Sequence, residues 1–225
     1  MVELTARRAI LLAVLGLTAL VGCNPTEGDG VTLTESRTVS DAFEGVRVSD
    51  GLTVEVRLSP DNTGVIEVTS DTNLVPIILT EVIDGVLEVS ADNIAPTVAT
   101  SVTVTAPTLG SISVADEGGL VTLSDLARAG EGRDGELAVN VSEGAAIEVT
   151  GTCRNLRAIV TGPSSLRAAG LTCETAEIEM LQDALVEARV TERAVIRAAG
   201  EGTVRLTGSP EVTSEVTDGV TVEVE

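Results

Sequence analysis

Few residues of this 225-residue chain have the types and spacing that catalysis requires. Acidic side chains gather in two glycine-containing stretches, which hold Asp116 and Glu117, and Glu131, Asp134 and Glu136. Carboxylates that face each other across a cleft could serve as the general acid and base of a polysaccharide-cleaving enzyme. Short acidic stretches are more often solvated turns, and a single aromatic residue, Phe43, offers sugars little stacking surface. We therefore expect no catalytic residues.

Metal-binding patterns are equally sparse. Zinc sites need clusters of Cys or His, whereas the chain has no His and only three Cys. Calcium could be held by the "DNTG" stretch (61–64) or the "DEGG" stretch (116–119), but neither has the spacing of an EF-hand loop or of a repeated nonapeptide. Asn140-Val141-Ser142 matches an N-glycan acceptor, but it falls inside an expected strand. The sequence therefore predicts neither a metal nor another cofactor.

Charge and composition limit the partners. The formal net charge is −21, with 35 acidic residues against 14 basic ones, all of them Arg. Such a surface repels phosphate backbones, so we expect no nucleic-acid partner. The hydrophobic content of 43% is ample for a core. Because that core must be built from Val, Leu, Ile and Ala, it suits a narrow, repetitive interior.

Residues 1–22 predict a lipoprotein signal peptide. Arg7 and Arg8 precede a 14-residue apolar run, 9–22, which is shorter than the roughly 20 residues that span a membrane. A buried N-terminal helix is the alternative. The residues "LVGC" (20–23) resemble the lipobox of bacterial lipoproteins, which implies that Cys23 is acylated and becomes the mature N-terminus in the membrane of the cell envelope. Asn24 in place of Asp favours the outer over the inner membrane, and the polar stretch 23–36 is expected to be a flexible tether.

Strands dominate the rest of the chain. Between residues 37 and 110, apolar and polar residues alternate in short runs such as "LTVEVRL" (52–58), separated by turn residues. Asp84-Gly85 between two such runs indicates a hairpin. We expect a meander of strands in this N-terminal region.

Residues 111–225 repeat. Apolar residues recur at a start position and two, four, ten and twelve residues after it, with Ser214 as the one polar member. The frames start at Leu137, Leu156, Ala176, Ala194 and Val212, which are 19, 20, 18 and 18 residues apart, and an irregular earlier copy starts at Ile112. A strand pair with this period predicts the coils of a parallel β-helix. Residues 174–199 alone could also form a helix, because Ile178, Leu181 and Leu185 have helical spacing.

The other two cysteines fit the coils. Cys153 and Cys173 each lie three residues before a frame, and Thr191 and Ser209 hold the equivalent place later. Stacked coils are about 4.8 Å apart, within the Cα separation that a disulfide accepts. We predict a disulfide between neighbouring coils in an oxidising compartment, with two stacked thiols as the alternative.

The order of these stretches resembles a known family. "FEGVRVSDGLTVEVRL", "SDTNLVPIILTEVIDGVLEVS" and "VTVTAPTLGSISVADEG", followed by the glycine-punctuated coils, are similar to the GIN domain, an adhesin head domain of bacterial secreted and lipid-anchored proteins. The resemblance covers residues 37–225. It implies an all-β fold, a right-handed parallel β-helix with strands packed at its N-terminal end, and it supplies no catalytic residues.

Together these features predict a lipid-anchored, non-catalytic module of the bacterial envelope that binds a protein or glycan. A polysaccharide-active enzyme and a purely structural envelope component are the competing classes.

Overall fold

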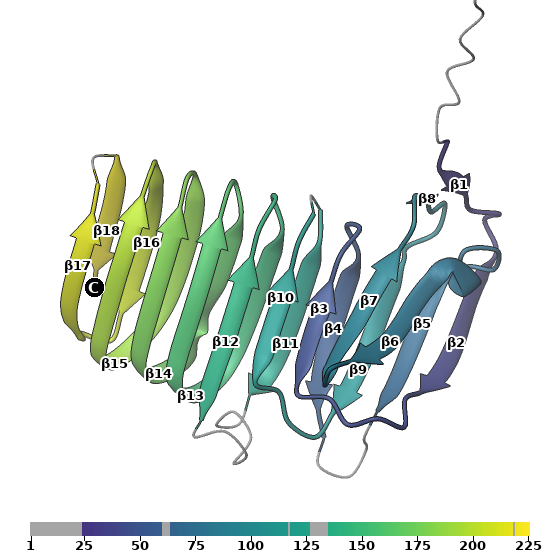
Figure 1. Ribbon diagram of the computed structural model, residues 1–225, viewed down its shortest axis with the longest axis horizontal. Coiled ribbons are helices and arrows are strands. Elements are labelled where there is room, and N and C mark those ends of the chain that lie inside the picture. The colour runs from purple at the N-terminus through teal and green to yellow at the C-terminus, as the bar shows by residue number, and fades with distance from the viewer. Residues whose placement is uncertain (1–23, 60–63, 117, 127–134, 218) are drawn as a thin grey trace, which may run out of the picture.

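The computed structural model describes residues 24–59, 64–116, 118–126, 135–217 and 219–225, and the regular structure in these ranges is β apart from one short 3-10 helix, η1 (Figure 1). No helix in the described ranges is long and apolar enough to cross a membrane. The all-β prediction is confirmed. The elements in chain order are β1 (Thr26–Glu27), β2 (Thr32–Thr38), β3 (Gly45–Val48), β4 (Thr53–Leu58), β5 (Val65–Asp71), η1 (Val75–Ile77), β6 (Ile78–Ile83), β7 (Val86–Ala91), β8 (Ile94–Ala95), β9 (Ser101–Ala106), β10 (Ser111–Val114), β11 (Leu120–Leu126), β12 (Glu136–Val141), β13 (Ala146–Thr161), β14 (Ser165–Leu181), β15 (Ala184–Ala199), β16 (Gly202–Thr207), β17 (Glu211–Val216) and β18 (Val220–Val224).

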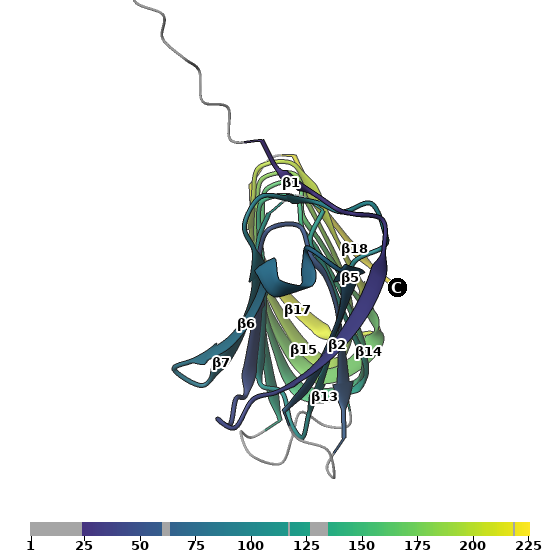
Figure 2. The same cartoon turned by 90° about the vertical axis from the view of Figure 1, so that its right-hand side faces the viewer.

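The strands form two ladders on either side of a narrow interior (Figure 2). The first ladder runs β6-β7-β3-β10-β12 and ends at β17; the second runs β2-β5-β9-β4-β11 and ends at β16 and β18. The long strands β13, β14 and β15 belong to both, because the N-terminal part of each pairs in the second ladder and its C-terminal part in the first. The chain therefore alternates between the two faces as it advances along the stack.

The register of the ladders confirms the repeat. Leu137 lies opposite Leu156, which lies opposite Ala176, and the row continues through the start of each later frame. These side chains point inward and are buried, except in the last coil. The helical alternative for 174–199 is wrong, because β14 and β15 cover almost all of it and Ile178 is fully buried between stacked strands. Packing between coils outweighs the local helix propensity.

The N-terminal region departs from the expected meander. Among the described strands of this region, only β6 and β7 are chain neighbours that pair directly, as an antiparallel hairpin around Asp84-Gly85. Strands β3 and β4 instead pair in parallel with β10 and β11 on one side and with β7 and β9 on the other. The sheet is mixed rather than wholly parallel, because β2, β5 and β6 pair antiparallel with their neighbours. The alternation of buried Val54 and Val56 with more exposed residues shows that one face of β4 is buried, but it does not specify which strands lie beside β4.

The N-terminal end of the stack is closed by η1 and its flanks. Leu74 and Val75 are fully buried there, over the interior. The Arg37 guanidinium of β2 donates hydrogen bonds to the carbonyls of Val75 (2.7 Å) and Ile78 (2.6 Å), so that it ties β2 to η1 and β6. This end therefore exposes little of its apolar interior.

The buried carboxylate of Asp71 holds the segments that precede β2 and β9 in place. Asp71 accepts hydrogen bonds from the backbone N–H groups of Gly30 (2.6 Å), Thr97 (2.9 Å) and Val98 (3.1 Å). Burial raises the pKa of Asp71, but the N–H donors of Val98, Gly30 and Thr97 outweigh it, and the pKa lies below its ordinary value. Residues 26–36, which we expected within a flexible tether, contribute β1, paired with β8, and most of β2, paired with β5.

Candidate functional site

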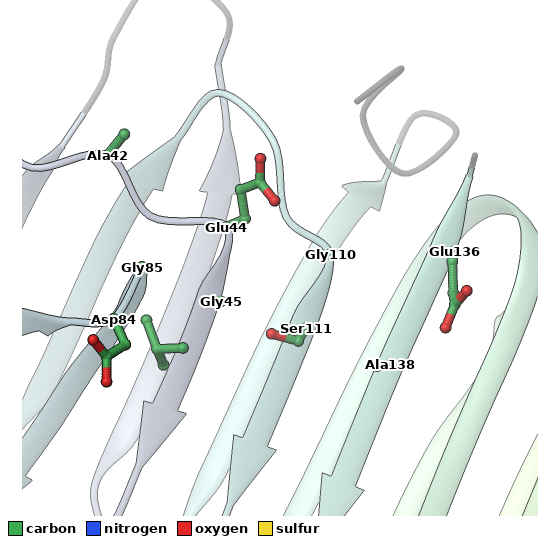
Figure 3. Close-up of a pocket in the computed structure, with 10 residues that line it drawn as sticks. Ala42, Glu44, Gly45, Asp84, Gly85, Gly110, Ser111, Glu136 and Ala138 are labelled. Carbon is green, nitrogen blue, oxygen red and sulfur yellow. The ribbon is translucent and has the colours of Figure 1, made fainter. Parts of the chain in front are cut away.

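A groove of about 460 Å³ lies on the outer surface of the first ladder, where β3, β10 and β12 begin (Figure 3). One wall is the loop before β3, and the turn of the β6–β7 hairpin closes one end. Its lining residues are Ala42, Glu44, Gly45, Asp84, Gly85, Val86, Gly110, Ser111, Glu136 and Ala138.

The floor of the groove is a row of small residues. Gly45, Ser111 and Ala138 lie opposite one another on β3, β10 and β12. They form the outer face of these strands because the residues after them, Val46, Ile112 and Val139, point into the core. A Cβ at Gly45 would lie 2.5 Å from the Ser111 hydroxyl oxygen and 3.2 Å from a methyl carbon of Val86. A side chain at position 45 would therefore have to displace the Ser111 hydroxyl, and the small residues of this row give the groove its depth.

The walls are held by backbone hydrogen bonds. The Glu44 N–H donates to the Gly85 carbonyl (3.0 Å), and the Glu44 carbonyl accepts from the Gly110 N–H (2.7 Å). Asp84 and Gly85 have positive φ angles of 50° and 77°, as a tight hairpin turn requires. The hairpin read from the sequence thus positions Asp84 at one end of the groove.

Three carboxylates from separate elements line the groove. Asp84 lies at one end, Glu136 at the other and Glu44 on the wall between them, and Figure 3 shows them spread along the groove rather than directed at a common point. Among the described residues, no cluster of three or more His, Cys, Asp or Glu is arranged to hold a metal ion. The arrangement suits contacts with a cationic or hydroxyl-bearing ligand along the groove more than acid–base catalysis at one bond.

Only some of the candidate acidic residues can be placed. Glu136 borders the groove, but Glu117, Glu131, Asp134 and residues 61–63 lie outside the described residues. The Asp116 carboxylate accepts a hydrogen bond from the Asp50 N–H (2.8 Å), so it joins the turns of two neighbouring coils. The sequence did not single out Glu44 or Asp84 as site residues, because spacing along the chain does not indicate which turns the strand pairing brings together.

Two of the three cysteines lie in the part of the chain that the structure describes. Cys153 and Cys173 lie opposite each other on β13 and β14, with Cα atoms 4.5 Å apart, and they form the predicted disulfide. Val190, not Thr191, lies opposite Cys173, because the register shifts where the coil shortens from 20 to 18 residues. Cys23, the predicted lipidation site, lies outside the described residues.

The outer surface of the second ladder carries an alternating column of charges. Its members, one on each successive coil, are Glu148, Arg167, Glu187, Arg205 and Glu223. Arg167 is 2.7 Å from Glu148, and Arg205 is 3.3 Å from Glu187 and 2.8 Å from Glu223. The hydrogen bond with Glu223, and then that with Glu187, raise the pKa of Arg205. These exposed pairs add little to stability, but they fix a regular charge pattern on a stiff surface.

Solved structures share this fold. An adhesin described as putative from Bacteroides fragilis superposes with a TM-score of 0.69, at 16% identity, over 88% of this chain and 99% of its own. A "putative lipid binding protein" from Parabacteroides distasonis gives a TM-score of 0.55, at 15% identity, over 90% of this chain and 100% of its own. A further "putative adhesin" from the same species gives 0.51, at 18% identity, with coverages of 90% and 100%. None of the curated proteins matches the chain.

The family model described as "Putative auto-transporter adhesin, head GIN domain" matches residues 42–210. The matched range runs from the loop before β3 to just beyond β16, so it includes the groove, the disulfide and all but the last coil of the stack. On this match, and with the fold that the solved structures share, the chain belongs to the GIN-domain family.

Proposed function

We propose that this protein is a lipid-anchored binding or adhesion module of the bacterial envelope, and that the groove along β3, β10 and β12 is its ligand site. The groove is the observation that carries the proposal. It combines a floor of small residues with acidic groups at its ends, a shape that admits an extended polar ligand such as a glycan or a peptide segment.

A binding role is favoured over catalysis of glycan cleavage. The groove carboxylates come from different elements and are spread along its length (Figure 3). Glycoside hydrolysis needs two carboxyl groups that converge on one bond from about 5 to 10 Å apart. The family match to adhesin head domains supports the same choice.

The anchor is proposed at Cys23. The leader and the lipobox-like residues 20–23 support it, and Asn24 favours the outer membrane. Only Asn24 and Pro25 separate Cys23 from β1, so the domain would lie close to the membrane surface. Acyl chains on Cys23 would supply about 0.8 kcal/mol of membrane affinity per buried CH₂ group.

We also infer that the stack is a right-handed parallel β-helix within the mixed sheet, and that residues 37–225 form one domain. Parallel pairing throughout residues 111–225 supports this interpretation, and from β12 onward paired residues are 17 to 20 positions apart.

The groove is tested by blocking it. Ala138→Arg places a long cationic side chain on the floor, whereas Asn140→Arg adds the same group two residues along β12, outside the groove. Labelled protein is titrated against isolated bacterial envelopes and against arrayed envelope glycans. We expect Ala138→Arg to weaken binding about tenfold or more and Asn140→Arg to leave it nearly unchanged. Equal binding by both variants would refute the groove as the site.

The anchor is tested separately by detergent phase partitioning after expression in bacteria. The unaltered protein should enter the detergent phase, and Cys23→Ser should remain in the aqueous phase. A Cys23→Ser protein that still enters the detergent phase would contradict the anchor without bearing on the groove.

A further inference from the structure

The two ends of the stack differ in how they are covered. The N-terminal end is closed by η1 and the Arg37 hydrogen bonds. At the other end, the last coil is formed by β17 and β18, which lie at the far tip of the stack (Figure 1). Stacked-repeat proteins normally need a polar capping element at each end.

The interior is open at the last coil. In one inward row, Met180 is 0% exposed and Ala198 5%, whereas Val216, the next member, is 44% exposed. In the facing ladder, Leu206 is 0% exposed and its neighbour Val224 is 49% exposed. Two rows of apolar side chains that are buried in the preceding coils are therefore exposed to solvent at this end.

The backbone at this end also lacks neighbours. Strand β17 pairs with β15, and β18 pairs with β16; neither has a second strand beside it in the part of the chain that the structure describes. Each leaves the N–H and C=O groups of one edge available to a further strand.

On both ladders, the last coil places glutamates beside arginines of the coil before it. Glu211, Glu215 and Glu223 each follow an arginine of the preceding coil, at positions 193, 197 and 205. Arg205 lies between two glutamates, and Arg197 is 2.8 Å from Glu177 and 3.9 Å from Glu215. The charged residues of β17 and β18 are all acidic, so a strand added to this edge would meet no basic side chain on them.

We propose that the end face formed by β17 and β18 binds an extended, basic segment of another polypeptide, which adds a strand to the stack. The segment that fits alternates apolar with polar residues and carries Arg or Lys four residues apart, because Glu211 and Glu215 have that spacing. A segment that pairs first with β17 and then with β18 would cover Val216 and then Val224 with its apolar side chains. A second copy of this end fits poorly, because pairing β17 with itself would bring glutamates together. This inference depends neither on the lipid anchor nor on the groove.

The chain itself supplies a probe of the right chemistry. Residues 192–207, "ERAVIRAAGEGTVRLT", form the coil that already covers the other side of β17 and β18, with Arg193, Arg197 and Arg205 opposite the three glutamates. A labelled synthetic peptide of this sequence is titrated with the purified protein, and fluorescence anisotropy reports binding. A second peptide has all three arginines replaced by glutamate.

We expect saturable binding of the arginine peptide and about tenfold weaker binding to the double variant Glu215→Arg, Glu223→Arg, the effect of losing two strand-to-strand charge pairs. The glutamate peptide should show the reverse preference and bind the double variant better. Glu81→Arg on β6, the edge strand at the opposite end, is the matched control and should leave binding of the arginine peptide unchanged.

Three results would overturn the proposal. The first is binding of neither peptide, which would make the glutamates a guard against added strands. The second is equal binding of both peptides by all variants. The third is a molecular mass in solution that corresponds to a dimer and falls to the monomer value in Val216→Asp, which would make a second copy the occupant.

Discussion

A single buried isoleucine provides a stringent test of the stack. Ile178 lies in β14 with no exposed surface, and its inward row contains Ala158 on one side and Ile196 on the other. The helical interpretation of residues 174–199 would instead group Ile178 with Leu181 on one face. In the structure, Leu181 is 40% exposed. The two substitutions Ile178→Ala and Leu181→Ala therefore distinguish the two interpretations.

The expected magnitudes follow from burial. Ile178→Ala removes three carbon atoms, about 2.4 kcal/mol at roughly 0.8 kcal/mol each. It also leaves a cavity that adjacent strands cannot close, so the total loss should be about 3 to 4 kcal/mol. Leu181→Ala removes as many atoms from a partly solvated position without creating an enclosed cavity. We expect it to lose about 1 kcal/mol.

The assay is urea unfolding followed by far-UV circular dichroism, because the chain has no Trp or Tyr to report by fluorescence. Glu179→Ala, between the two sites and exposed, is the control and should change the free energy of unfolding by less than about 0.5 kcal/mol. Equal losses for Ile178→Ala and Leu181→Ala would refute the period-two register of β14.

Other expectations follow from the disulfide, from the hydrogen bonds that Asp71 accepts and from the glycines at positions 85 and 151. Replacing Cys153 and Cys173 together by Ser should lower the free energy of unfolding by about 3 kcal/mol, from the loop of 20 residues that the bond closes, and an unchanged urea midpoint would refute this. Because the folded-state pKa of Asp71 is lowered, its contribution is present above the unfolded value of about 3.9 and is lost as pH falls through the lower folded value. Melting temperatures measured from pH 6 to pH 2 should therefore fall less steeply for Asp71→Asn, and parallel curves would contradict this. A Cβ at Gly151, where φ is 127°, would lie 2.2 Å from a backbone oxygen, so Gly151→Ala should lose about 3 kcal/mol or more; Gly85→Ala, with φ of 77° and open space around its Cβ, should lose about 1 kcal/mol. Similar urea midpoints for these two glycine variants would show that the close approach at Gly151 is relieved at little cost.

The repeating half of the chain could be predicted because its signal is local. Inward residues two apart identify the side chains that face the core, and the 18 to 20 residues between frames identify the residues of the next coil that they meet. The disulfide followed from the same register. The prediction at Thr191 was wrong by one residue, because a shortened coil changes the register through an irregularity that the apolar pattern does not record.

The N-terminal half could not be predicted in the same way. Alternation in β3 and β4 identifies strands but not their partners, and β7 and β9, later in the chain, stack outside them. The groove depends on this arrangement, because it joins the loop at Glu44, the turn at Asp84 and the start of β12. Only Glu136 of its three carboxylates was a candidate from the sequence, since spacing along the chain carries no information about residues brought together by non-local pairing.

The central claim is that a ligand occupies the groove of the first ladder in the cell envelope. Site-specific photo-crosslinking in intact cells tests it most directly, with a photoreactive amino acid at position 136 on the groove rim and, for comparison, at exposed position 140 of the same strand. The account predicts a discrete crosslinked species from position 136 that is absent from position 140 and is lost in the presence of Ala138→Arg. The same crosslinks from both positions, or none from position 136, would contradict it.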